Sequence, residues 1–396
     1  MTDVILHHYA LSPFAEKVRI GLGLKQAAWK SVDIPIIMPK PDLMPLTGGY
    51  RKTPVMQVGA DIYCDTQLIM LELEWRLPSP PFLLKGREGE ARAITMWIDR
   101  NMFAPAVGLV MSQIDVAGMF GAGFARDRSD FSGRNCDPER LRAVLPVVRD
   151  QAYGQLSLAE AMLADGRRFV LGAEPSMPDC ALYNPVWFIQ QHLGVAASPL
   201  DRLPRIVAWS ERMKALGNGK RKDITATEAL EIAKSAKPAA TSVDTGEPSG
   251  LKAGRQISIT PDDTGKVPVS GELVGLSADS ISIARNDPRV GEVVVHFPRA
   301  GFIIHRYSRL ENDTRSQRDR GADDYGTQKQ MQIDEDRCGS DPVVAASFQK
   351  LPGRVSLPSG TRPGSPSSAD LWSVPVTALS TCGNMRVVRG SVGSCP

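Results

Sequence analysis

The sequence has no apolar run of the roughly 18 residues that a membrane-spanning helix needs. Its first residues lack the basic segment and long apolar stretch of a secretory signal peptide. The 6 cysteines lie far apart, with no C-x-x-C pair and no spacing typical of metal ligands. These absences predict a cytoplasmic protein in a reducing compartment, without a membrane partner and without a metal.

The sequence also lacks an excess of charge of one sign. Its 47 basic and 44 acidic side chains give a formal net charge of +3, far from the clustered basic excess of nucleic-acid-binding proteins. We therefore expect a small-molecule partner and no nucleic acid. Hydrophobic residues make up 42% of the 396 residues, close to the average of globular chains, so most of the length is able to bury a core. The length predicts two or three folded units.

Residues 1–82 predict short strands alternating with helices. A helix that follows the first strand has Ser12 at its N-cap and Pro13 at its first position, where a missing N–H costs nothing. A second helix begins at Asp65-Thr66 and runs to Arg76. The predicted strands are Val4–His8, Trp29–Ile34, Thr53–Val58 and Ile62–Cys64. The predicted order is therefore β-α-β, loop, β-β-α.

The rest of the chain divides by composition. Residues 86–225 have apolar residues at helical spacing and predict an all-helical domain, in which Ser176-Met177-Pro178-Asp179 is a capping arrangement. Residues 226–250 are rich in small and polar residues and predict a linker. Residues 251–306 contain short β-branched runs and predict a small antiparallel β unit. Residues 307–396 have few apolar residues and predict a mostly disordered tail.

Four motifs resemble the glutathione transferase family. The segment Tyr9-Ala10-Leu11-Ser12-Pro13-Phe14-Ala15-Glu16-Lys17-Val18-Arg19 is similar to the family's first turn and helix. Thr53-Pro54-Val55, Asp65-Thr66 and Ser176-x-x-Asp179 follow in the family's order. The resemblance covers about residues 1–215 and implies an α+β architecture, with a thioredoxin-like N-terminal domain and an all-α domain. The β unit after residue 250 has no place in the two-domain family.

The resemblance assigns Ser12 the catalytic role of stabilising the thiolate of bound glutathione. A thiol pKa falls at a helix N-terminus beside a hydrogen-bond donor, and Ser12 occupies such a position. The alternatives are that Ser12 is only an N-cap, or that Tyr9 takes the role. The loop Met44-Pro45-Leu46-Thr47-Gly48-Gly49-Tyr50-Arg51-Lys52 departs from the commoner Asn-Pro-x-Gly-Lys-Val-Pro pattern, so contacts at the glycyl end are not assigned beyond Lys52.

The resemblance also implies the residues that bind glutathione. Pro54 matches a cis-proline that exposes the main chain of Thr53 to an extended peptide. Asp65 and Thr66 open a helix whose N-terminus favours a carboxylate, and Asp65 is able to accept from the ligand ammonium. Lys52 is placed to pair with a ligand carboxylate. For each, the plain structural alternative is a strand-initial proline, a helix cap or a solvated surface lysine.

The function implied is a transferase of detoxification, acting as a cytoplasmic homodimer. Bound glutathione attacks an apolar electrophilic small molecule, and no metal takes part. Two alternatives stay open: a non-catalytic binding or scaffold module, and a glutathione-dependent isomerase or dehalogenase. The aromatic and apolar residues of the helical domain either line the second substrate's pocket or form plain core; they are Trp97, Phe103, Met111, Phe120 and Phe124.

Overall fold

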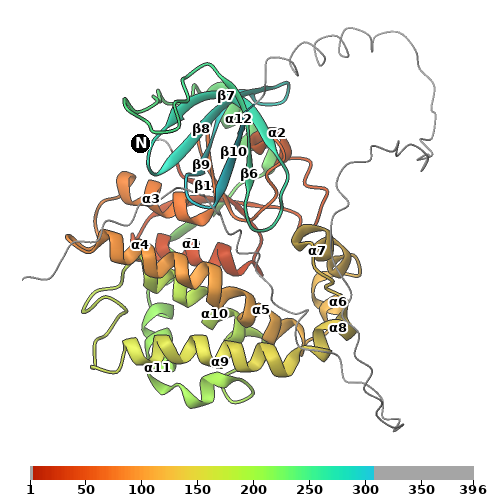
Figure 1. The fold of residues 1–396 in the computed structure, drawn as a ribbon, viewed down its shortest axis with the longest axis vertical. Coiled ribbons are helices and arrows are strands. Elements are labelled where there is room, and N and C mark those ends of the chain that lie inside the picture. Colours follow the sequence, from red (N-terminus) through yellow and green to blue (C-terminus); the bar gives the residue numbers. More distant parts are fainter. Residues whose placement is uncertain (1–2, 307–396) are drawn as a thin grey trace, which may run out of the picture. The chain divides into compact units, whose positions relative to one another are not determined.

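The computed structural model describes residues 3–306, and the predicted disordered tail of residues 307–396 lies outside the described residues. The N-terminal region has the predicted β-α-β, loop, β-β-α order. Its elements are β1 (Ile5–His8), α1 (Pro13–Leu24), β2 (Ala28–Asp33), α2 (Met44–Thr47), β3 (Val55–Val58), β4 (Asp61–Cys64) and α3 (Thr66–Arg76). Figure 1 labels β1 and the helices α1, α2 and α3 of this region. Strand β1 pairs parallel to β2 and antiparallel to β3, which forms a hairpin with β4. This is the predicted thioredoxin-like domain.

The middle of the chain is helical, as predicted. Its elements are α4 (Glu88–Trp97), the π-helical segment η1 (Ile98–Met102), α5 (Phe103–Met111), α6 (Val116–Phe120), α7 (Phe124–Ser132), α8 (Pro138–Ala143), α9 (Leu145–Met162), α10 (Met177–Leu193), the 3-10 segment η2 (Pro199–Arg202) and α11 (Pro204–Lys214). Helix α10 packs against α1, α4 and α5 and therefore joins this region to the first. The Ser176–Asp179 capping box forms at its start, and Asp179 also accepts from the indole N–H of Trp209 at 2.9 Å.

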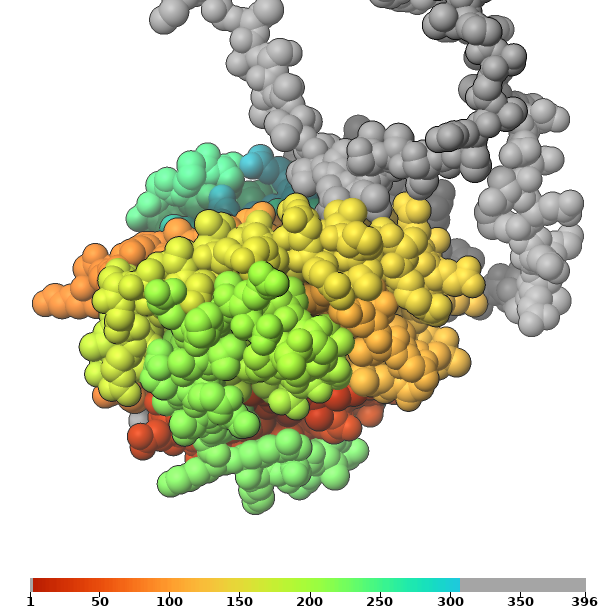
Figure 2. Space-filling view, turned by 90° about the horizontal axis from the view of Figure 1, so that it is seen from below, coloured from red at the N-terminus to blue at the C-terminus, as the bar shows by residue number. Residues whose placement is uncertain are grey.

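Residues 220–250 differ from the prediction. Residues 220–223, expected in the helical domain, form strand β5 (Lys220–Asp223), which pairs parallel to β2. The predicted linker contains helix α12 (Ala226–Ser235), because Ala229, Leu230 and Ala233 are buried against one face of the sheet. Buried Gln57 donates to the Ala229 carbonyl at 2.8 Å and fixes α12 on β3. In Figure 2 the green residues of β5 and α12 lie against the red N-terminal residues.

The C-terminal β region continues the N-terminal sheet. Its strands are β6 (Gln256–Pro261), β7 (Val269–Leu276), β8 (Ser280–Asp287), β9 (Gly291–Pro298) and β10 (Phe302–Arg306). They pair antiparallel to one another, as predicted, and β9 in addition pairs parallel to β4. The result is one 10-stranded sheet in the order β10-β6-β7-β8-β9-β4-β3-β1-β2-β5. The β unit is therefore joined to the thioredoxin-like domain through the edge of β4.

A buried polar cluster marks the junction of β4 and β9. The imidazole Nε2 of His296 lies 2.9 Å from Asp61 Oδ1, and its Nδ1 lies 2.8 Å from the Ser282 hydroxyl. The imidazole also stacks on Tyr63, with ring centroids 4.5 Å apart. All four residues are buried, so the two parts of the sheet share polar as well as main-chain contacts.

The two faces of the sheet bury separate apolar cores. One core joins α1 and α3 to the helical region and includes Leu6, Ile20 and Phe188. The other joins α12 to the inner side of the β unit and includes Ile5, Leu230 and Phe297. Within residues 3–306, no helix has the length and apolar character needed to cross a membrane.

Candidate functional site

The three N-terminal motifs meet at one end of the sheet. Strand β1 ends at His8, β3 begins at Val55 and β4 ends at Cys64, and the pairings His7↔Val55 and Val55↔Cys64 place these ends side by side. Because the neighbouring residues continue from adjacent strand ends, segments 9–12, 52–54 and 65–66 surround one position. The topology therefore brings the predicted site residues together.

Ser12 caps helix α1 at this end. Its backbone is extended, and its Oγ accepts from the Ala15 N–H at 3.2 Å. The hydroxyl still has one hydrogen to donate. The Ser12 N–H donates to the Tyr9 carbonyl at 3.1 Å, which closes the turn that leads into α1. Burial raises the pKa of Tyr9, while the Arg128 charge and hydrogen bonding with Ser12 lower it, so the Tyr9 phenol is a neutral group beside Ser12.

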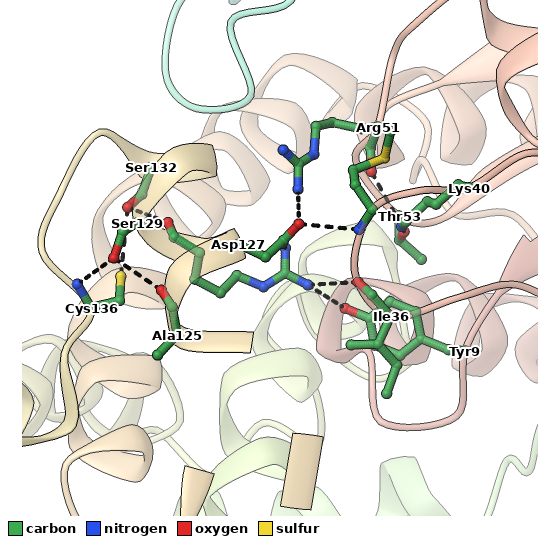
Figure 3. A network of polar contacts seen from close by, with 12 residues as sticks. Tyr9, Ile36, Lys40, Arg51, Thr53, Ala125, Asp127, Ser129, Ser132 and Cys136 are labelled. Carbon is green, nitrogen blue, oxygen red and sulfur yellow. Dashed lines mark hydrogen bonds and ion pairs between the residues drawn. The ribbon is translucent and has the colours of Figure 1, made fainter. Parts of the chain in front are cut away.

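The Thr53–Pro54 peptide bond is cis, as the resemblance implies. A residue that sequence reasoning missed, Lys40, lies behind this turn and donates to Thr53 Oγ1 at 2.9 Å (Figure 3). Lys40 is 2% exposed, and its ammonium lies 5.7 Å from the centre of the Tyr9 ring. Burial lowers the pKa of Lys40 to about 7, aided by the charges of Arg128 and Arg51. Lys40 stands between two prolines in a loop without periodicity, so no sequence signal marked it.

Asp65 and Thr66 form the N-terminus of α3. Asp65 has a left-handed backbone, with φ at 71°, and its carboxylate accepts from the Gln67 N–H at 3.0 Å. Thr66 is buried, and its Oγ1 accepts from the Lys17 ammonium at 3.0 Å. Asp65 therefore caps α3, Thr66 is the first residue of the helix, and the N-terminus that they form is suited to an anion.

Lys52 is engaged by a residue from the β unit. It forms an ion pair with Asp263, on the turn between β6 and β7. The adjacent turn residue Asp262 pairs with Arg100 of η1 at 2.7 Å. Gly265 of the same turn donates to the Phe131 carbonyl of α7 at 2.7 Å. The β6–β7 turn thus contacts both the first region and the helical region beside the predicted site.

Helix α7 also contacts the loops of the site, through hydrogen bonds and an ion pair. Asp127 pairs with Arg51 and accepts from the Met38 N–H at 3.1 Å. Arg128 donates to the Ile36 carbonyl at 3.0 Å and to the Tyr9 hydroxyl at 3.4 Å. Figure 3 shows this network between α7 and the loop that carries Lys40. Sequence reasoning missed Asp127 and Arg128, because charged residues on a short helix have the pattern of a solvated surface.

The apolar residues considered for a second pocket differ in their surroundings. Phe120 and Phe124 are buried in the core and stack on each other, with ring centroids 4.5 Å apart. Phe103 packs on Phe14, two residues after Ser12, with ring centroids 4.3 Å apart. Phe103 therefore contacts the N-terminal turn of α1. Among residues 3–306, no group of three or more His, Cys, Asp or Glu side chains is placed to hold a metal ion.

A sheet of this topology, with a capped α1, a cis-proline turn and a capped α3 at one end, defines the glutathione-transferase-like class of proteins. The family model of the glutathione S-transferase N-terminal domain matches residues 6–81, and a domain of unknown function (DUF7962) matches residues 114–221. A GST-like protein from Pseudomonas syringae is 38% identical, and the match covers 78% of this chain and 100% of that chain with a TM-score of 0.62. The chain therefore belongs to the GST-like family.

Other solved structures match over a shorter part of the chain. A glutathione S-transferase from Rhodospirillum rubrum F11 is 20% identical over 54% of this chain and 88% of its own, with a TM-score of 0.44. A maleylacetoacetate isomerase from Anaeromyxobacter dehalogenans 2CP-1, with bound dicarboxyethyl glutathione and citrate, is 18% identical over 55% and 91%, with a TM-score of 0.37. The search of curated proteins found no match. A match over 78% of 396 residues must extend past residue 225, so the Pseudomonas syringae protein shares more than the first two regions.

Proposed function

We propose that the protein binds glutathione at the end of the sheet where residues 9–12, 52–54 and 65–66 meet. The observation that carries this proposal is the convergence of three different recognition elements on one position. The Thr53 main chain at the cis bond suits an extended peptide, the start of α3 suits a carboxylate, and Asp65 suits an ammonium group. Glutathione carries all three of these groups.

The proposed reaction is attack by the glutathione thiolate on an electrophilic, partly apolar small molecule. Ser12 donates its hydroxyl hydrogen to the sulfur, and the N-terminus of α1 favours the negative charge. The thiol proton passes to solvent, the sulfur forms a bond to the electrophilic carbon, and a leaving group, where present, departs with its bonding electrons. Ser12 supports this role because its oxygen accepts from the Ala15 N–H and its hydroxyl is able to turn its hydrogen from the Tyr9 phenol to a bound sulfur.

The resemblance extends the proposal to a cytoplasmic homodimer with a role in detoxification. In such a dimer, the edge of β4 is not open to the second copy, because β9 of the same chain pairs with it. The contact would therefore use surfaces other than this strand edge. A mass measurement in solution at micromolar concentration tests the dimer, and a monomeric mass contradicts it.

Binding to immobilised glutathione, with elution by free glutathione, tests the proposal. A protein that passes through the column would contradict it. Conjugation of a generic aryl halide then separates an enzyme from a scaffold module that only binds. Product analysis separates transfer, in which glutathione remains attached to the product, from isomerisation, in which it is recovered unchanged.

A further inference from the structure

Lys17, in the second turn of α1, is a lysine with no exposed side-chain surface. Its ammonium lies between two acceptors, 3.0 Å from Thr66 Oγ1 and 2.6 Å from Asp99 Oδ2. The three residues come from α1, from the first position of α3 and from the π-helical segment η1. This buried contact therefore links the helical region to the hydroxyl at the α3 N-terminus.

Stability does not account for this arrangement. Removing two charges from water costs free energy, and well-packed apolar residues in place of a buried ion pair are often as stabilising. The other carboxylate oxygen, Asp99 Oδ1, is buried and has no hydrogen-bond partner among the described residues, which adds a cost of about 1–3 kcal/mol. Asp99 also lies on a π-helical turn, a rare element that is frequent at functional sites.

The Lys17 ammonium determines whether the Thr66 hydroxyl donates or accepts a hydrogen bond on each side. A hydroxyl has one hydrogen and two lone pairs, whereas an ammonium only donates. Because Lys17 donates to Thr66 Oγ1, that oxygen is an acceptor on the inner side and its hydrogen is left for another group. Thr66 stands next to Asp65, at the helix start where the first N–H groups of α3 have no acceptor within the helix. A carboxylate at this helix N-terminus would receive both kinds of donor and a nearby positive charge.

We propose that Lys17 is a positioning residue of the glutathione site: held by Asp99, it fixes Thr66 as a donor to the α-carboxylate of the γ-glutamyl group. This inference rests on the proposed function and adds residues to it that the motifs did not assign. Lys17 acts through Thr66 and through its charge, without touching the ligand. Asp99 keeps the ammonium in place.

The test compares two ligands, glutathione and the analogue 4-aminobutyryl-cysteinylglycine, which lacks the α-carboxylate. The quantity measured is the ratio of the analogue's Kd to the Kd of glutathione, by calorimetry. We expect wild type to prefer glutathione at least about tenfold, as for a hydrogen-bonded charged group. The ratio should fall toward one in Lys17→Met and in Lys17→Met/Asp99→Leu, which leaves no unpaired buried carboxylate. Thr66→Val should lower it too, and adding Lys17→Met should lower it little further.

The matched control is Lys25, another buried lysine, at the opposite end of α1. It pairs with Glu74, near the C-terminal end of α3, and donates to the Pro80 carbonyl at 2.6 Å. Neither of these partners is at the α3 N-terminus. Lys25→Met should lower stability without changing the ligand ratio. An unchanged ratio in both Lys17 variants would overturn the positioning role while leaving the proposed function intact. Failure of wild type to bind glutathione would overturn both.

Discussion

Asp263 of the β unit pairs with Lys52, which lies directly before the Thr53–Pro54 turn. The side chain of Lys52 is 15% exposed and that of Asp263 is 38% exposed, so water screens the pair and its contribution to stability is about 1 kcal/mol or less. A ligand carboxylate that binds Lys52 has to replace this internal carboxylate. The pair therefore connects the added β unit to the proposed site.

Asp263→Asn should tighten glutathione binding by up to about fivefold, because the ligand no longer competes with a carboxylate for Lys52. Titration calorimetry at fixed ionic strength measures the effect. Asp262→Asn is the control, since Asp262 pairs with Arg100 rather than Lys52. Equal affinity in wild type and Asp263→Asn would remove Lys52 from the list of ligand contacts.

Asp65→Ala should weaken glutathione binding by about ten- to a hundredfold, because it removes a charged partner of the ligand ammonium. It also removes the cap on Gln67, so a matched variant is needed. Asp65→Asn retains an acceptor for the cap and tolerates the positive φ of this position, but has no charge. If Asp65→Asn binds as well as wild type, the carboxylate charge has no role in binding.

Ser12→Ala should raise the pKa of the bound glutathione thiol toward its free value and lower turnover, with little change in affinity. The ultraviolet absorbance of the thiolate, followed against pH in both proteins, reports the shift. Ser12→Cys should instead form a mixed disulfide with glutathione disulfide, releasing one glutathione thiolate. Identical titrations and turnover for wild type and Ser12→Ala would make Ser12 a helix cap only and return Tyr9 to consideration.

Lys40 should make ligand binding sensitive to pH near neutrality. Burial lowers the pKa of Lys40 to about 7, so its charge is present below this pH and lost above it. Affinity for an anionic ligand should therefore fall as the pH rises from 6 to 8, and Lys40→Met should remove that component. The folded protein binds fewer protons than the unfolded chain between about pH 7 and the ordinary lysine pKa of 10.5, so stability should increase over this interval. A Lys40→Met protein with the wild-type pH profile would contradict this assignment.

His296→Phe should destabilise the junction of β4 and β9. The ring still stacks on Tyr63, but Asp61 and Ser282 each lose a buried partner, at a cost of about 1–3 kcal/mol in the free energy of unfolding. Urea denaturation measures the change. His305 is exposed on β10, and His305→Phe should alter stability by less than about 0.5 kcal/mol. Similar midpoints for both variants would show that the cluster does not stabilise the junction.

The sequence predicted those parts of the fold that local chemistry determines. Ser12-Pro13 and Ser176-Met177-Pro178-Asp179 marked helix starts through capping, and short β-branched runs marked the strands of the β unit. The pairing of β4 with β9 could not be predicted from the sequence, because Asp61 and His296 are 235 residues apart and no local pattern relates them. Helix α12 was missed because two of its three buried side chains, Ala229 and Ala233, are too small to give a strong apolar pattern.

For the candidate site, the sequence likewise identified the motif residues but not the buried residues that contact them. The motifs named the residues at the ends of β1 and β4 and before β3, and topology brought these ends together. Lys17 and Lys40 were not assigned roles, because a lysine in a sequence is expected at the surface. Their burial depends on partners from other elements, Asp99 for Lys17 and Thr53 for Lys40. Such partners are visible only once the chain is folded.

The pairing of β9 with β4 also sets an order of events during synthesis. Strand β4 is made early, and its partner edge follows more than 230 residues later, as the separation of 235 residues between Asp61 and His296 shows. At typical translation rates this interval is roughly 10–50 s. During that time the nascent domain carries an open strand edge, which is a template for unwanted pairing with other chains. Ribosome-associated chaperones would thus meet this protein with its β4 edge uncovered, and a message truncated before β9 would yield a product that keeps that edge.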